Sequence, residues 1–174
     1  PSMMTNIVDA DADAIRIGAF AKCAPPLRSP AIISCLRERL LSGAIDTLGS
    51  DHSPSSPDLK TGSDFFAIWG GIAGIQHALP LLLDAALAPL AAISDNVAQR
   101  FRLPGKGGFH IGHEADFALL SLSPRIISPA ESLTRHPISP YFHHAIQHRV
   151  DATYLRGSRI THETRGRFLQ PTQA

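Results

Sequence analysis

The stretch AIDTLGSDHSP, residues 44–54, decides the fold that we expect. Residues 44–50 have the length and apolar content of a short buried strand, and Asp51 and His52 follow directly after its end. Ligands of α/β proteins bind outside the carboxyl ends of parallel strands, where a carboxylate can hold a metal or act as a general base. Asp51 is therefore the first candidate site residue. The alternative is that Asp51 caps the following turn and His52 is an ordinary loop residue.

The segment before this stretch predicts a strand and a helix. IRIGAFAKCA (15–24) is a short apolar run that ends at two prolines, which suits a buried strand that stops at a loop. Ser29-Pro30 is a typical helix start, and the apolar residues after it recur at helical spacing until Ser42-Gly43. Strand, helix and strand form a βαβ unit, so we expect 44–50 to lie parallel to 15–24.

The remainder of the chain changes character near Pro104. Before it, helical segments run in pieces from about Ile75 to Arg102, with Pro80 and Pro89 as kinks or breaks. After it, alternating segments punctuated by glycine predict strands, with Arg156-Gly157 as a hairpin turn. We therefore divide the chain into an α/β part, residues 1–103, and a small β-rich part, residues 104–174.

Composition excludes several classes of function. The chain has 174 residues, 44% of them hydrophobic and 18% charged, so we expect a folded core in one domain or slightly more. With 16 Lys and Arg against 15 Asp and Glu and only 6% aromatics, no nucleic-acid partner is expected. Two cysteines make no disulfide framework, and no apolar run is long enough to span a bilayer. We expect a cytoplasmic protein with no membrane partner.

Three motifs occur in an order that is specific for a known family. KCAPPLR (22–28), IDTLGSDHSP (45–54) and WGGIAGIQ (69–76) together resemble the carboxyl-terminal half of the allantoinases, cyclic amidases of the amidohydrolase superfamily. GGFHIGHEADF (107–117) and ATYLRG (152–157) are similar to later elements of that family. The resemblance implies the carboxyl-terminal portion of a (β/α)₈ TIM barrel, with 15–24 and 44–50 as its last two strands, plus the β-rich part of a flanking sandwich domain.

The resemblance also assigns roles to residues. It implies that Asp51 is a metal ligand that moves the proton when a zinc-bound hydroxide attacks a ring amide. It implies a substrate-facing position for Cys23, although a cysteine at a strand end is alternatively a nucleophile. His52, Ser53, Gly70 and Gly71 complete the expected substrate-binding set. We expect Asp51, Cys23 and the backbone of Gly70 and Gly71 to line one concavity.

Glycines 70 and 71 allow a close approach of the backbone to a planar ureide ring, and the alternative is a plain entry into the following helix. Cys35 falls within the expected helix, and we interpret it as a core residue.

Only one of the family's metal ligands has a match. The resemblance implies a binuclear zinc site whose other ligands, a His-x-His pair, a carboxylated lysine and two further histidines, precede Lys22 in the family. Residues 1–21 contain no histidine, and a catalytic zinc needs about three protein ligands. His110, His113 and Glu114 have spacings that metals use, as do His143, His144 and His148, with 144 and 148 on one helical face; we interpret both groups as surface residues.

We therefore expect a truncated or split allantoinase that is inactive alone and whose full-length form is a homo-oligomer that converts allantoin to allantoate. Ala24 and Ser53 stand where dihydroorotase-like relatives carry Asn and Ala, and hydantoinases usually lack the Lys-x-x-Pro-Pro-x-Arg string. Other hydantoin rings rank second and dihydroorotate third. The alternative from a different class is a non-catalytic remnant or interaction piece.

Overall fold

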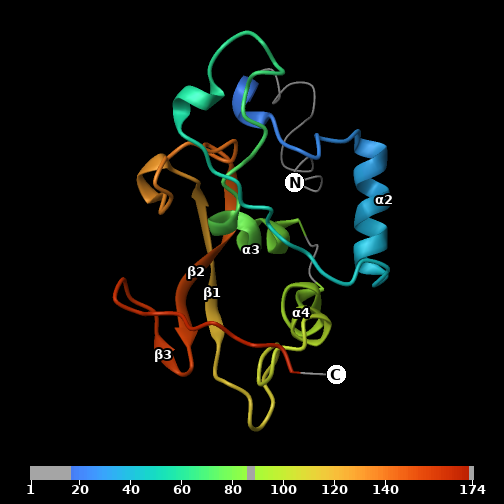
Figure 1. Ribbon diagram of the computed structural model, residues 1–174, viewed down its shortest axis with the longest axis vertical. Coiled ribbons are helices and arrows are strands. Elements are labelled where there is room, and N and C mark those ends of the chain that lie inside the picture. The colour runs from blue at the N-terminus through green and yellow to red at the C-terminus, as the bar shows by residue number, and fades with distance from the viewer. Residues whose placement is uncertain (1–16, 86–88, 173–174) are drawn as a thin grey trace.

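The computed structural model describes residues 17–85 and 89–172, in which short helices come first and an antiparallel sheet last (Figure 1). The α-helices are α2 (Pro30–Leu41), α3 (Ile75–Asp84) and α4 (Asp95–Arg100). Short 3₁₀ helices are η2 (Gly18–Ala21), η3 (Pro57–Lys60), η4 (Leu90–Ile93) and η5 (Pro129–Glu131). The strands are β1 (Phe117–Ile126), β2 (Ala145–Leu155) and β3 (Ser158–Arg159). None of the described helices is long and apolar enough to cross a membrane.

Helix α2 confirms the expected helix between Ser29 and Ser42. Ser29 adopts the extended conformation of an N-cap residue, Pro30 occupies the first turn, and the helix ends before Gly43, whose φ is +76°. The helix buries only a narrow face, formed by Ile33 and Leu40. Cys35 is exposed, so its interpretation as a core residue is wrong. It lies two positions from Ile33, and residues two apart on a helix do not share a face.

The prediction of two strands before Asp51 is wrong for the residues that the structure describes. Residues 18–21 form η2, in which the amide of Lys22 donates to the carbonyl of Ala19, and residues 46–50 belong to no helix or strand. The βαβ unit is therefore not formed. A parallel strand needs a partner along its edge, and neither segment has one among residues 17–85 and 89–172. Residues 15 and 16 lie outside the described residues.

Helical pieces follow as expected up to residue 100. Pro80 lies inside α3 and is buried, so it does not end that helix, whereas Pro89 directly precedes η4. The amide of Leu48 donates to the carbonyl of Ala92, which ties the segment before Asp51 to η4. The positions of the elements agree with a helical part followed by a strand part, and the boundary at residues 103 and 104 stays a prediction.

The sheet has the order β1-β2-β3, and both pairs of strands are antiparallel. Arg156 and Gly157 connect β2 to β3, with φ values of +51° and +78°, which confirms the expected hairpin turn. The register of β1 against β2 shifts between Leu122 and Arg125. Pro124 lies within that shift, and a proline has no amide hydrogen to give to the partner strand.

The main core joins the helical part to the sheet. Ile72 and Leu81 pack with Ile127, Tyr141 and Ile146, and Cys23 belongs to the same cluster. Helix α3 contacts β2, and Figure 1 shows α3 beside the middle of that strand. Asp84, the last residue of α3, accepts hydrogen bonds from the amides of Gln147 and His148. One end of the helix is thereby fixed to the strand.

We expect Ile146→Ala to lower the free energy of unfolding by about 2–5 kcal/mol, because this side chain is 1% exposed and its loss leaves a cavity. Leu122→Ala is the matched control, since Leu122 is 76% exposed on β1 and its loss should change stability by at most about 0.5 kcal/mol. Urea denaturation of both variants measures the difference. Equal losses would contradict the placement of this core.

The carboxylate of Asp84 makes stability depend on pH. Burial opposes its charge, but hydrogen bonds from the His148 ring and from the two β2 amides outweigh burial and hold its pKa below the ordinary 3.8. A lowered pKa stabilises the fold above pH 3.8, and that contribution is lost as the pH falls through the folded-state value. We expect Asp84→Asn to reduce the urea midpoint at pH 7 and the difference from the unmodified chain to shrink towards pH 2. A difference that is independent of pH would contradict this role.

Candidate functional site

Three sequence motifs that are far apart along the chain lie against one another. His52 and Ile72 form an isolated parallel bridge, and the amide of Ser53 donates to the carbonyl of Ile72 at 2.9 Å. This bridge aligns the Asp51-His52-Ser53 segment with the segment that follows Trp69. It is one isolated step of parallel pairing, in a region where the sequence predicts the end of a strand.

Contacts at Gly70 and Gly71 complete the region where the three motifs meet, which we call the junction. A Cβ placed on Gly70 would lie 3.7 Å from Cβ of Ala24, so this glycine adjoins the Lys22–Arg28 motif. A Cβ on Gly71 would lie 2.5 Å from Oγ and 2.6 Å from the carbonyl oxygen of Ser53. Gly71 is therefore required by the approach of Ser53, whereas Gly70 has ordinary contact distances.

His52 supports the start of helix α3. Its Nδ1 accepts hydrogen bonds from the amides of Gly74 and Ile75, both at 3.2 Å, so a neutral ring carries its proton on Nε2. Amides in the first turn of a helix lack partners inside the helix, and His52 satisfies two of them. The ring is exposed, which leaves Nε2 available to solvent or a ligand.

Asp51 is exposed and lies in the left-handed region of the backbone, with φ of +46°. That conformation is uncommon outside glycine and is best tolerated by Asn and Asp. The carboxylate lies within electrostatic range of Cys23. Burial raises the pKa of the Cys23 thiol, the Asp51 charge raises it further, and the Lys60 charge opposes the shift. Cys23 is 7% exposed and packs in the main core, where a thiol with a raised pKa is neutral at pH 7.

Two lysines hold this region together, and the sequence interpretation gave neither of them a role. Nζ of Lys22 donates to the carbonyls of Phe65 and Ile68, and its charge lies 4.7 Å from the centre of the Phe65 ring. Nζ of Lys60 donates to the carbonyl of Lys22 at 2.9 Å and lies 3.4 Å from that of Ala19. Lys60 is only 5% exposed, and burial lowers its pKa. The sequence feature that could have drawn attention to them is the rarity of lysine, since the chain has three lysines in all.

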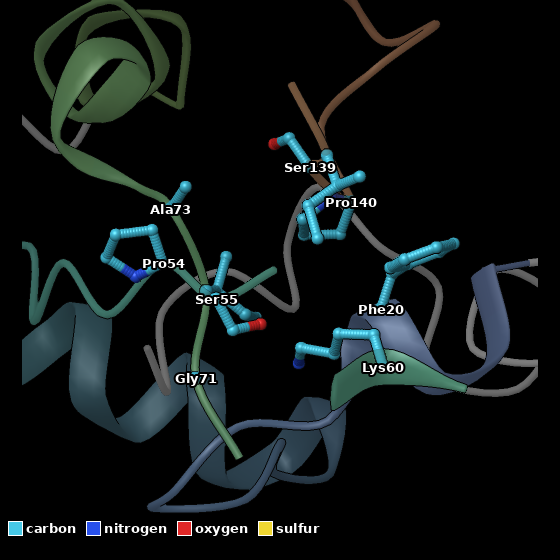
Figure 2. A pocket seen from close by; sticks show the side chains of 10 residues that line it. Phe20, Pro54, Ser55, Lys60, Gly71, Ala73, Ser139 and Pro140 are labelled. Atoms are coloured by element: carbon cyan, nitrogen blue, oxygen red, sulfur yellow. The ribbon is translucent and has the colours of Figure 1, made fainter. Parts of the chain in front are cut away.

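A small cavity lies beside this junction (Figure 2). The volume open to the centre of a water molecule is about 10 Å³, roughly what one buried water requires, and too little for a ureide ring. Of the predicted site residues, Gly71 lines this cavity; Asp51 and His52 are exposed and Cys23 belongs to the core. The full lining is Phe20, Pro54, Ser55, Lys60, Gly71, Ile72, Ala73, Ile138, Ser139 and Pro140.

The histidine groups do not form a metal centre. No group of three or more His, Cys, Asp or Glu side chains in the described ranges could hold a metal ion. His110 and His113 pack edge to face at 4.8 Å beside an open cleft of about 310 Å³ near α4. His148 lies on β2 and its Nδ1 is 2.5 Å from Asp84, so the expectation that 144 and 148 share a helical face is wrong.

Comparison with known proteins identifies relatives over almost the whole chain. An allantoinase of Deinococcus radiodurans is 46% identical and one of Rubrobacter xylanophilus is 45% identical, over 91% and 92% of this chain. The chain spans only 38% and 39% of the lengths of these two proteins. The resemblance to allantoinases is thereby confirmed, for about two fifths of their length. No family model matches the chain.

Solved structures point to the same superfamily. The L-hydantoinase (dihydropyrimidinase) of Arthrobacter aurescens superposes with a TM-score of 0.82 at 27% identity, covering 97% of this chain and 40% of its own. A dihydropyrimidinase of Brevibacillus agri superposes with a TM-score of 0.73 at 26% identity, covering 82% of this chain and 34% of its own. The described fold is therefore that of a part of these larger enzymes.

We expect Gly71→Ala to destabilise the chain by about 1–3 kcal/mol and to change the fluorescence of Trp69, the single tryptophan. The added methyl would overlap Ser53 and lie 2.7 Å from Nε1 of Trp69. Gly70→Ala is the matched control, because its methyl meets ordinary contacts and should change stability by at most about 0.5 kcal/mol. Chemical denaturation followed by tryptophan emission compares them. Equal behaviour of the two variants would contradict the junction.

Proposed function

We propose that this chain, a homologue of part of the allantoinases, contributes to a metal-dependent cyclic amidohydrolase that opens allantoin to allantoate. The observation that carries the proposal is the 46% identity to an allantoinase over 91% of the chain. The junction of three motifs supports it, since the segments that the family resemblance identifies lie together around Ser53 and Gly71. Structural neighbours named hydantoinase and dihydropyrimidinase support the wider class of cyclic amide hydrolysis.

In this proposal Asp51 is the group that accepts and returns a proton. Its carboxylate is exposed at the junction and lies on the loop directly before the bridge between His52 and Ile72. The exposed His52, next to Asp51 in the sequence, and the backbone at Gly70, which adjoins Ala24, are the polar groups that we assign to a planar ring with its own donors and acceptors. Ser53 and Gly71 act mainly by holding the two loops at contact distance.

The described residues do not by themselves fit a zinc site. Asp51 has no second and third ligand-type side chain grouped with it in the part of the chain that the structure describes, and a catalytic zinc needs about three. A bound zinc would activate a water as the nucleophile, and its additional ligands would have to come from residues outside 17–85 and 89–172. The zinc dependence, the cytoplasmic location and the homo-oligomeric full-length form stay predictions.

Two alternatives have specific support. A hydantoin ring other than allantoin is favoured by the TM-score of 0.82 to an L-hydantoinase. A non-catalytic remnant is favoured by the lack of a three-ligand metal group among the described residues. Both alternatives give distinct outcomes in the experiment below.

We expect the 174-residue chain alone to show no allantoin ring opening above background with added zinc, and weak zinc binding by calorimetry. A chimaera in which this chain replaces the matching stretch of the Deinococcus radiodurans allantoinase should release allantoate. Turnover by the chain alone would contradict the expected dependence on further ligands. A folded chimaera that hydrolyses only other hydantoins would contradict allantoin as substrate, and one inactive on all rings would favour the remnant.

Asp51→Asn in the chimaera should retain the fold and reduce kcat by about 100-fold or more, because an amide cannot accept the proton of the attacking water. The matched control is Asp46→Asn, whose side chain is exposed five residues earlier in the same segment. We expect this control to change kcat by less than about twofold. Unimpaired turnover by Asp51→Asn would remove Asp51 from the mechanism.

A further inference from the structure

The hydroxyl of Ser55 is an unpartnered polar group in the wall of the small cavity. Ser55 is 9% exposed, and its Oγ is the buried side-chain oxygen that lacks a hydrogen-bond partner within residues 17–85 and 89–172. A buried hydroxyl without a partner costs free energy of folding, so such groups usually face a bound water or ion. The cavity beside it has room for one such particle.

Lys60 approaches the same cavity from η3. In Figure 2 its side chain extends towards Ser55, with Phe20 and Pro140 lining the cavity as well. Two carbonyl oxygens, those of Lys22 and Ala19, accept hydrogen bonds from its ammonium group. An ammonium group has three hydrogens, so one donor remains for an occupant. The rest of the wall combines apolar and proline side chains with Ser139, and proline offers no amide hydrogen.

The charge around Lys60 is not balanced by the neighbouring groups that the structure describes. No ion pair joins Lys60 to a carboxylate in the described ranges, and the titratable groups that influence its pKa, after burial, are Cys23 and Lys22. Cys23 is a neutral thiol at pH 7 because burial raises its pKa, and Lys22 adds a second positive charge. Buried charges are usually paired, so among the described residues the positive charge of Lys60 beside the cavity lacks a counter-charge.

We propose that the cavity between Ser55 and Lys60 binds a single monovalent anion of the size of chloride. The Ser55 hydroxyl and the third Lys60 hydrogen donate to it, and its single negative charge balances that of Lys60. Sulfate, phosphate and organic carboxylates are excluded by size, since about 10 Å³ admits the centre of one small particle. A neutral water would fill the volume but would leave the charge unbalanced.

This anion would link two loops of the functional junction. Ser55 follows the Asp51–Pro54 segment, whereas Lys60 holds the carbonyls of η2 and Lys22. An anion that bridges them binds the folded chain and not the unfolded one, so it stabilises the fold by mass action. The proposal concerns binding and does not depend on whether the junction is catalytic.

The test is the thermal unfolding midpoint of the 174-residue chain in sodium chloride against sodium gluconate at equal ionic strength, because gluconate is too large for the cavity. We expect chloride to raise the midpoint in proportion to the logarithm of one plus the ratio of the chloride concentration to Kd, by about 3–6 °C at ten times Kd. Chloride-35 NMR gives a second readout, in which bound chloride broadens the line and added bromide reverses the broadening.

Variants identify the site. Ser55→Ala should weaken the chloride response at least about tenfold in Kd, since a donor to a charged acceptor is lost. Lys60→Met should abolish it, and if that variant does not fold, the NMR titration of Ser55→Ala decides. The matched control, Ser63→Ala, removes an exposed hydroxyl eight residues along and should respond as the unmodified chain does. Equal midpoints in the two salts without line broadening, or an unchanged response in Ser55→Ala, would overturn the proposal in favour of a water.

Discussion

The described fold depends on two lysine ammonium groups that bind backbone carbonyls where no strand is available to do so. Buried carbonyl groups must find donors, and in a parallel sheet the neighbouring strand supplies them. Here Lys60 donates to the carbonyls of Ala19 and Lys22, and Lys22 in turn donates to those of Phe65 and Ile68. This chain of contacts joins η2 to η3 and to the loop before Gly70. The Lys22 motif is thereby held next to the loop that carries Gly70 and Gly71.

Local sequence patterns correctly predicted the elements that form through contacts between residues close together in the sequence. Helix α2 begins and ends where Ser29-Pro30 and Ser42-Gly43 indicate, and Arg156-Gly157 makes the expected turn. The strands expected at 15–24 and 44–50 were wrong because a strand exists only with a partner, which no local pattern specifies. The interpretation of Cys35 as a core residue was wrong for a related reason. Helix α2 buries a narrower face than its apolar residues suggest. Ile32 and Leu41 are apolar residues of this helix that are exposed.

The family motifs predicted which segments meet, whereas the chemistry between them required coordinates. The order of three motifs was enough to expect a shared junction, and the contacts of Gly70 and Gly71 agree with it. Lys60 and Ser55 lie in the polar loop after Pro54, where a lysine and a serine are ordinary surface residues by composition. Both are buried because η3 turns back towards Lys22, and Trp69 donates its amide to the carbonyl of Leu59 beside it.

The glycine pair shows how one motif serves two purposes. A close backbone approach was expected at both glycines, towards a planar ring. At Gly71 that approach is made by the chain itself, since Ser53 occupies the space that any side chain would need. At Gly70 the nearest atoms belong to Ala24 and Lys22 at ordinary distances, so the absence of a side chain leaves backbone accessible there. The cavity next to Gly71 is too small for a ring. A ring substrate is therefore expected to meet the exposed Asp51 and His52 or the backbone of Gly70 rather than Gly71, which keeps the two loops in contact.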